Sequence, residues 1–196
     1  MRSVGPFLIA LALGTTRAGT LEAQSAQAIS LQVSGLYNGV FGNAFDGLQN
    51  GIGGEAQIRY TPGALSIGAG FEYTRHGLDN RSEDAKLYGG FVEPRYRIHT
   101  GSNVLAPYMS ARFSLLKVGF TGGALSTNSN FIQLNGGGGL LYRVGPRINL
   151  DFGATYGYNR LGSGALKRNG TTLRMFDSSS GSNVVVRFGF AVGIGG

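Results

Sequence analysis

The sequence has no cysteine, no tryptophan, few charged residues and no long apolar run. These absences limit the classes of protein to which it can belong. Without cysteine, the 196-residue chain has no disulfide, no thiolate metal site, no thiol nucleophile and no residue for lipidation at a lipobox. Charged residues make up only 14% of the chain. After the N-terminal segment, no stretch approaches the ~18 apolar residues of a membrane-spanning helix, so none is expected.

Glycine is abundant, at 35 residues, and the N-terminus has the pattern of a secretory signal peptide. A basic start precedes an apolar run over 4–13, which is too short to cross a membrane as a helix. Ala26-Gln27-Ala28 is an acceptable cleavage site, and an earlier cut after Ala18 or Ala23 is the alternative, since the intervening stretch is long and carries Arg17 and Glu22. We therefore expect a signal peptide over 1–28 and one domain over 29–196, whose net charge is 15 − 9 = +6.

The remaining chain contains eight segments that alternate apolar with polar or small residues, the period-two pattern of β-strands. Each is longer than the about 5–6 residues of a common strand and long enough to cross a bilayer when tilted. The segments cover 29–42, 51–61, 65–76, 86–98, 104–116, 131–144, 148–159 and 183–195. Short connections, at 61–64, 99–103 and 145–147, alternate with long ones, around 43–50, 77–85, 117–130 and 160–182. Short turns at one end and long loops at the other are typical of an outer-membrane β-barrel.

One face of each segment is free of charge within the core of the strand, and on three of the segments it carries a tyrosine at a matched height. The strands that precede the three short connections place Tyr60, Tyr96 and Tyr142 on this face. Tyrosine is common in strands generally. Three tyrosines at equivalent positions nevertheless favour an aromatic girdle at a membrane interface.

The opposite face combines Gly, Ser, Thr, Asn and Gln with ten ionisable residues. These are Glu55, Arg59, Glu72, Glu93, Arg95, Arg97, Arg112, Arg143, Asp151 and Arg187. Every cation among them is arginine, whose planar guanidinium suits enclosed, bidentate pairing with carboxylates. An arginine facing lipid costs about 2–4 kcal/mol near the bilayer midplane. We therefore expect all ten inside the barrel as a paired network. On the uncharged face, Pro94 and Pro107 predict bulges, since proline cannot donate to a strand ladder.

With these residues, the chain resembles the eight-stranded outer-membrane β-barrel family, the OmpA-like and Opa-like transmembrane domains. The resemblance covers essentially all of 29–196 and rests on strand number, loop asymmetry, the FVEPRYR strand and the C-terminal segment. That segment is similar to the family's assembly signal through Arg187, Gly189, Val192 and Ile194, although it does not end on an aromatic residue. The resemblance implies an all-β, antiparallel up-and-down transmembrane barrel with short periplasmic turns and long extracellular loops. It also implies the barrel-assembly machinery as a partner, with no peptidoglycan-binding domain after the barrel.

Few residues offer catalytic or metal-binding chemistry. His76 lies near Ser82 and the acids Asp79, Glu83 and Asp84, which are the residue types of a Ser–His–acid set. All of them fall in one charged connection, so we expect no enzyme. The same acids have the hard oxygens that Ca²⁺ prefers, but neighbouring Arg81 and Lys86 offset their charge. We expect neither a metal ion nor a cofactor.

The connection 160–182 is basic and has a turn signal at its centre. Asn169-Gly170 predicts a hairpin that projects beyond the membrane. Its cations are Arg160, Lys167, Arg168 and Arg174. A basic connection of this kind could bind anionic lipid headgroups or another surface.

These patterns favour a structural protein, exported through a cleaved signal peptide to the bacterial outer membrane. Its lumen would be polar and charge-paired, its loops would serve envelope integrity or surface interaction, and its partners would include outer-membrane lipid and lipopolysaccharide. Nucleic acid is not expected for an exported chain. A narrow porin or gated channel is an alternative, and six lumen arginines against four acids would bias it weakly toward anions. A secreted lipocalin-like small-molecule binder is a third interpretation, which requires an apolar interior.

Overall fold

The computed structural model describes residues 28–79, 83–120, 125–127 and 129–194. The signal peptide predicted over 1–28 therefore lies outside the described residues apart from Ala28. Eight long strands make up the body of the molecule. They are β1 (Ile29–Phe41), β2 (Leu48–Tyr60), β3 (Leu65–Leu78), β4 (Asp84–Arg97), β5 (Leu105–Phe120), β7 (Asn130–Arg143), β8 (Ile148–Leu161) and β11 (Ser179–Ile194). The described connections contain β6 (Leu125–Thr127), β9 (Gly164–Arg168), β10 (Thr171–Phe176) and one 3-10 turn, η1 (Asn43–Phe45).

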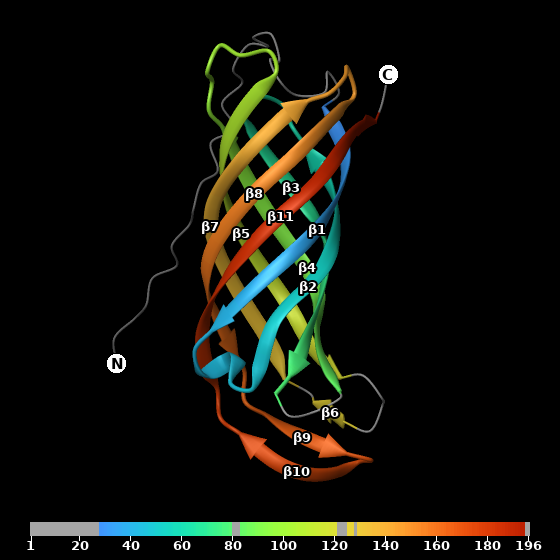
Figure 1. Cartoon of the computed structure of the whole chain (residues 1–196), viewed down its shortest axis with the longest axis vertical. Helices are drawn as coiled ribbons and strands as arrows, with labels where there is room; N and C mark the ends of the chain where they lie inside the picture. Colours follow the sequence, from blue (N-terminus) through green and yellow to red (C-terminus); the bar gives the residue numbers. More distant parts are fainter. Residues whose placement is uncertain (1–27, 80–82, 121–124, 128, 195–196) are drawn as a thin grey trace, which may run out of the picture.

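The eight long strands close into an antiparallel barrel in the order β1-β11-β8-β7-β5-β4-β3-β2 (Figure 1). The first and last strands complete the barrel with a ladder that runs from Ile29 opposite Ile194 to Phe41 opposite Ser182. Because the barrel is closed, it has no sheet edge with unpaired backbone N–H and C=O groups. A lipid environment requires this pairing. The predicted eight-stranded up-and-down barrel is confirmed by this topology.

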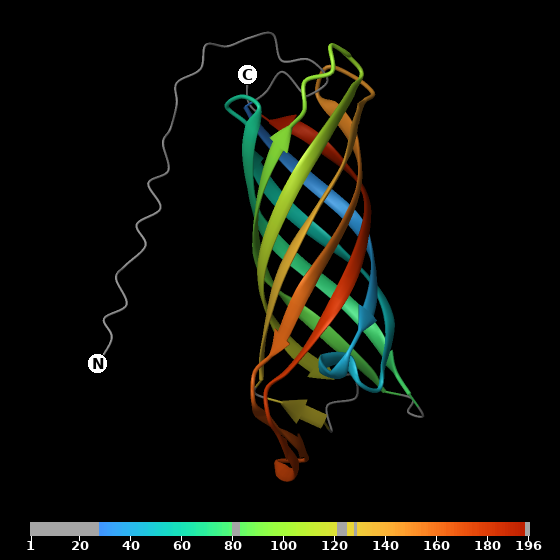
Figure 2. The ribbon, with the colours of Figure 1, turned by 90° about the vertical axis from the view of Figure 1, so that its left-hand side faces the viewer.

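The two ends of the barrel differ as the connection lengths predict. The three short connections lie at one end, which is the upper end in Figures 1 and 2. The lower end, called here the long-loop end, carries η1 and a small sheet of order β10-β9-β6. The β9–β10 turn places Asn169 at φ 49° and Gly170 at φ 82°, both left-handed, as in the tight hairpin turn predicted from their sequence.

Two strands extend further toward the long-loop end than their side-chain patterns predict. β5 continues to Phe120 and β11 begins at Ser179, each four residues beyond the expected bounds of 116 and 183. The ladder still pairs Ser179 with Leu161 of β8. Backbone pairing does not need an apolar face, so the barrel wall extends past the alternating segments.

The predicted bulges at the two prolines are wrong. Val92 stands opposite Phe113 and Arg95 stands opposite Ser110, three residues further along each strand, so the β4–β5 register does not shift around Pro94. Glu93 and Pro94 have no partners in the β4–β5 ladder, because Pro94 has no N–H to donate. Pro107 pairs with Leu140 in an uninterrupted β5–β7 register.

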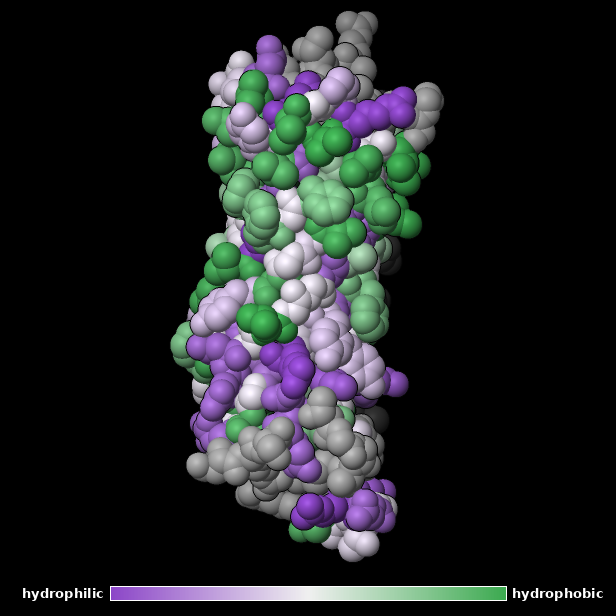
Figure 3. All heavy atoms as spheres, turned by 45° about the vertical axis from the view of Figure 1, so that its right-hand side comes forward, coloured by the Kyte–Doolittle hydropathy of each residue, from purple (hydrophilic) through white to green (hydrophobic). Residues whose placement is uncertain are grey.

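Side chains alternate between the interior and the outside, and the outward set forms an apolar band. On β3, for example, Leu65, Ile67 and Phe71 are 52–55% exposed. Figure 3 shows hydrophobic residues over the upper and middle parts of one side of the barrel and hydrophilic residues toward the long-loop end. None of the helices in the described ranges is long and apolar enough to cross a membrane.

Candidate functional site

Glu93 on β4 is the centre of the polar interior. Its carboxylate is fully buried. It accepts hydrogen bonds at 3.1 Å from the guanidinium groups of Arg59, Arg95, Arg112 and Arg187. These arginines come from β2, β4, β5 and β11 respectively. One carboxylate therefore ties together four strands around the barrel.

Asp151 on β8 is a second fully buried acceptor in the same network. It accepts hydrogen bonds from Arg95 Nη1 at 2.9 Å, Gln32 Nε2 at 2.5 Å and Tyr108 Oη at 2.6 Å. Arg187 Nε lies 3.5 Å away. Because Arg95 and Arg187 also contact Glu93, the two carboxylates belong to one connected set of ion pairs.

Arg112 on β5 joins the remaining acids to this set. Its Nη1 lies 2.6 Å from Glu55 and 2.9 Å from Glu72, and its guanidinium stacks 3.9 Å from the Phe91 ring centroid. The network thus contains four arginines (Arg59, Arg95, Arg112, Arg187) and four carboxylates (Glu55, Glu72, Glu93, Asp151). Its formal charges cancel, which offsets much of the cost of burying each charge.

Two glycines make room for the largest side chains of the network. A Cβ at Gly153 would lie 2.7 Å from Tyr108 Oη and 2.9 Å from Arg187 Nη2. A Cβ at Gly139 would also overlap the Tyr108 hydroxyl. The wall of β7 and β8 therefore needs glycine at these positions so that Tyr108 and Arg187 can lie against the backbone.

The network contains eight of the ten ionisable residues that the sequence predicts for the interior. Arg97 and Arg143 are half-buried at the ends of β4 and β7, next to the short connections. The structure therefore places six arginines toward the interior but concentrates four of them around the acids. Tyr108 and Gln32 also belong to the network, through their hydrogen bonds to Asp151. Their inward direction on β5 and β1 could have been predicted from strand alternation.

A layer of asparagine side chains, which was not predicted from the sequence, lies next to the network on the long-loop side. Asn183 donates to Asn38 at 3.0 Å and accepts from Asn135 at 3.1 Å and Asn159 at 2.9 Å. All four are buried and come from β1, β7, β8 and β11. Their inward parity on each strand was the available signal, but an asparagine alone does not indicate which partner it takes.

Apolar side chains also face the interior, contrary to the expectation of a wholly polar or small-residue inner face. At the long-loop end the buried cluster consists of Val40, Ala44, Phe45, Leu87, Leu116 and Phe131. The rings of Phe45 and Phe131 have centroids 5.3 Å apart. Because the strands and η1 surround these side chains, the apolar groups pack on one another and are largely removed from water.

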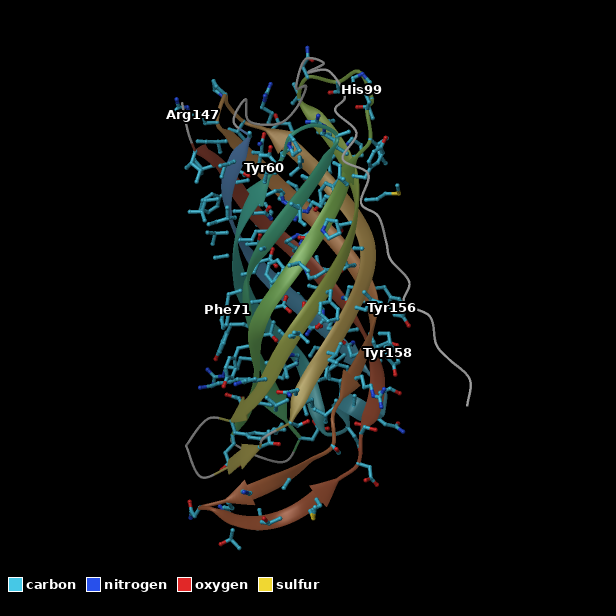
Figure 4. The ribbon with its side chains drawn as sticks, turned by 180° about the vertical axis from the view of Figure 1, so that it is seen from behind. Tyr60, Phe71, His99, Arg147, Tyr156 and Tyr158 are labelled. Atoms are coloured by element: carbon cyan, nitrogen blue, oxygen red, sulfur yellow. The ribbon has the colours of Figure 1, made fainter. Side chains whose placement is uncertain are left out.

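The predicted girdle tyrosines all lie on the outside. Tyr60, Tyr96 and Tyr142 are 51%, 53% and 43% exposed, at the short-turn ends of β2, β4 and β7. Figure 4 shows Tyr60 near that end and Tyr156 and Tyr158 nearer the long-loop end.

The second aromatic row, on the long-loop side, was not predicted. It contains Phe41, Tyr73, Tyr156 and Tyr158, and half-buried Tyr88 stands opposite Tyr73 in the β3–β4 ladder. On β4, Tyr96 and Tyr88 are eight residues apart, about 26 Å along the strand. A tilt of about 35–45° makes this roughly 20 Å in height, close to the ~25 Å apolar band of transmembrane barrels.

A basic surface follows the apolar band on β3, β4 and β5. Arg75 stands opposite Lys86 in the β3–β4 ladder, and Tyr88 of β4 stands opposite Lys117 of β5. All of these side chains point outward by strand parity. Arg75 pairs with Asp84, whereas no carboxylate in the described part of the chain pairs with Lys86 or Lys117.

The C-terminal residues proposed as an assembly signal lie on β11, two facing the interior and two facing outward. Arg187 and Gly189 are buried on the interior side, while Val192 is half-buried and Ile194 is exposed. Gly189 lies against the backbone of Val33 and the side chain of Ser34 on β1. The segment thus belongs to the seam where the first and last strands meet.

The structure does not bring His76 together with an acid. Its ring nitrogens contact Thr74 Oγ1 and the backbone oxygen of Gln49, both at 3.0 Å. Ser82 lies outside the described residues. Asp79 accepts a hydrogen bond from Gln49 Nε2 instead. Across the described ranges, no group of three or more His, Asp or Glu residues has the geometry to hold a metal ion.

No protein-family model matches the chain, and no curated protein sequence is similar enough to match it. Solved structures are similar. Neisserial surface protein A has 24% identity and a TM-score of 0.57, with 85% of this chain and 97% of that chain covered. The outer membrane protein OprG from Pseudomonas aeruginosa has 11% identity and a TM-score of 0.55, with 87% and 98% covered. The chain therefore has the fold of the eight-stranded outer-membrane β-barrels. Its apolar outer face and ion-paired interior are the reverse of a lipocalin.

Proposed function

We propose that this chain is a structural protein of the bacterial outer membrane, closed along its lumen, which displays its long connections outside the cell. The observation that carries the proposal is the set of four arginines that bind Glu93 from β2, β4, β5 and β11. An eight-stranded barrel has an interior only wide enough for side chains. A network that spans this interior fixes the strands relative to one another and leaves no water-filled path.

The balance of charges favours this proposal over an anion-selective channel. Four arginines and four carboxylates cancel inside the network, so the excess of positive charge is limited to Arg97 and Arg143 near the short-turn end. An ion that crossed the barrel would also have to displace the asparagine layer and the Phe45–Phe131 contact. These three barriers lie in series.

The basic surface on β3, β4 and β5 supports membrane lipid as the partner of this structural protein. Lys86 and Lys117 lie next to outward Tyr88, at the edge of the apolar band. Because Lys86 pairs with Gly119, Lys117 is its diagonal neighbour across the ladder, and two like charges this close repel one another unless an anion lies between them. The phosphate groups of lipopolysaccharide, whose acyl chains would cover the apolar band, have the required charge and position. Arg187, Gly189, Val192 and Ile194 remain our proposed signal for the barrel-assembly machinery.

Conductance in planar lipid bilayers tests the closed lumen. We expect the folded chain to insert without discrete current steps, because the network fills the interior. Heat-dependent gel mobility of the same sample establishes that it is folded, since a folded barrel runs differently until it is boiled. Regular, anion-selective steps from a sample that shows this mobility shift would support the channel and overturn the proposal.

A further inference from the structure

The long-loop end of the barrel contains a cavity that the proposed structural role does not use. Its volume is about 530 Å³, within the range of small-molecule sites. Apolar side chains form most of its wall, including Phe45, Leu48, Leu87, Val118 and Phe131. Four of the lining residues, Ala44, Phe45, Leu87 and Phe131, belong to the buried apolar cluster, and none of the described lining residues belongs to the asparagine layer or the ion-pair network.

The segment between β1 and β2 shapes the cavity. Gly42 adopts φ 90°, and Phe45 N donates to Gly42 O at 2.9 Å, so η1 turns inward at the long-loop end of the barrel (Figure 1). Phe45 is only 4% exposed and its ring contacts Phe131 of β7. One wall of the cavity is therefore fixed by packing on the barrel itself.

The charge of the cavity is opposite to that of the whole protein. Asp46, Asp79 and Asp177 lie among its lining residues, and no lysine or arginine does within the described part of the chain. Asp79 is held by Gln49 Nε2 at 3.2 Å and by its own N–H, which donates to Gly47 O at 3.0 Å. None of the three carboxylates is in an ion pair with a described residue. A chain with a net charge of +7 thus concentrates three acids around one apolar hollow.

We infer that this cavity binds a small amphiphilic cation, with an apolar or aromatic body and an amine. The apolar wall removes the body of the ligand from water. The three carboxylates attract the ammonium group and repel an anion of the same shape. The site is separate from the lumen network, so the binding needs no transport through the barrel.

Paired indole ligands of opposite charge test the inference, because the chain has no tryptophan and the indole fluorescence reports only the ligand. The protein is placed in nanodiscs of zwitterionic lipid, and empty nanodiscs provide the correction for partition into lipid. We expect tryptamine to bind with a blue shift of its emission. Indole-3-propionate should bind at least about tenfold more weakly, which corresponds to one well-placed charge interaction.

Variants of the lining residues separate the charge from the apolar wall. The combined Asp46→Asn, Asp79→Asn and Asp177→Asn variant should lose the preference for tryptamine. Asp84→Asn is the matched control, since Asp84 pairs with Arg75 and does not line the cavity. Ala85→Phe should reduce the binding of both ligands, because Ala85 is a fully buried lining residue and the ring would fill the space. Each variant is first tested for heat-dependent mobility, so that a loss of folding is recognised.

The outcomes are distinct from those of the conductance test. Equal binding of the two ligands, or an unchanged preference in the triple variant, would overturn the assignment of a cationic ligand. No binding of either ligand by the folded wild-type protein would overturn the site itself. Neither result depends on whether the lumen conducts.

Discussion

Arg187 Nη1 on β11 donates a hydrogen bond to Glu93 Oε1 on β4 at 3.1 Å, across the full width of the barrel. The two strands are four positions apart in either direction around the closed sheet. A single ion pair therefore connects opposite walls of the barrel. Glu93 also accepts hydrogen bonds from three other arginines. The stability of the barrel should depend strongly on this one carboxylate.

Glu93→Gln should lower the free energy of unfolding by about 3–5 kcal/mol, the usual cost of removing one partner from a buried ion pair. The substitution keeps the shape of the side chain but leaves four buried arginines with three acids. Urea titration in lipid vesicles, followed by heat-dependent gel mobility, measures the change. Glu83→Gln, in the half-buried connection before β4, is the control and should stay within about 0.5 kcal/mol of wild type. Similar losses in both variants would contradict a central role for Glu93.

Gly153→Ala should destabilise the barrel by about 1–3 kcal/mol, because the added methyl group would overlap Tyr108 and Arg187. Gly136→Ala is the matched control on the neighbouring strand, since a Cβ at Gly136 has no neighbour within 4 Å. The same unfolding titration compares the two. If both glycines accept alanine equally well, the packing of Tyr108 against the wall does not limit stability.

Val92→Arg tests which face of the barrel meets lipid. Val92 points outward, midway between Tyr88 and Tyr96, and is 44% exposed. An arginine there should cost about 2–4 kcal/mol and reduce folding into vesicles. Ser182→Arg, which also points outward but stands beside Tyr158 near the second aromatic row, should cost about 0–1 kcal/mol. The reverse ranking would place lipid elsewhere.

The double variant Lys86→Gln and Lys117→Gln tests the proposed lipid contact. Stability is measured in zwitterionic vesicles with and without added phosphatidylglycerol. Anionic lipid should stabilise the wild-type protein more than the variant, by about 2 kcal/mol at low salt, since each cation near the surface contributes about 1 kcal/mol. Added salt should weaken the difference by screening.

Lys167→Gln with Arg168→Gln is the control for this measurement, because both residues are exposed on the β9–β10 hairpin, away from the apolar band. This pair should respond to anionic lipid as the wild-type protein does. If the hairpin variant alone loses the response, the basic connection is the lipid contact and the surface on β3, β4 and β5 is not.

The period-two pattern was sufficient to predict the eight strands of the barrel and the outward direction of the three tyrosines. Alternation assigns Tyr60, Tyr96 and Tyr142 to one face wherever the barrel closes, because side-chain direction is fixed by the strand backbone. The Asn169-Gly170 turn was predictable for a similar reason, since few residue pairs adopt two left-handed conformations in succession. These features depend on local geometry.

The partners inside the barrel depended on tertiary structure. The sequence placed Glu93 and Arg187 on the interior face, but only the ladder registers and the order of strands around the barrel bring them to 3.1 Å. The same is true of the four asparagines and of Phe45, which η1 turns onto Phe131. Parity gives each side chain a direction, whereas contact across a lumen requires the closure and stagger of all eight strands. The sequence by itself therefore determined a membrane barrel with a charged interior. Tertiary structure decided that four arginines and four carboxylates form one network whose charges cancel, and that a separate apolar cavity lies at the long-loop end.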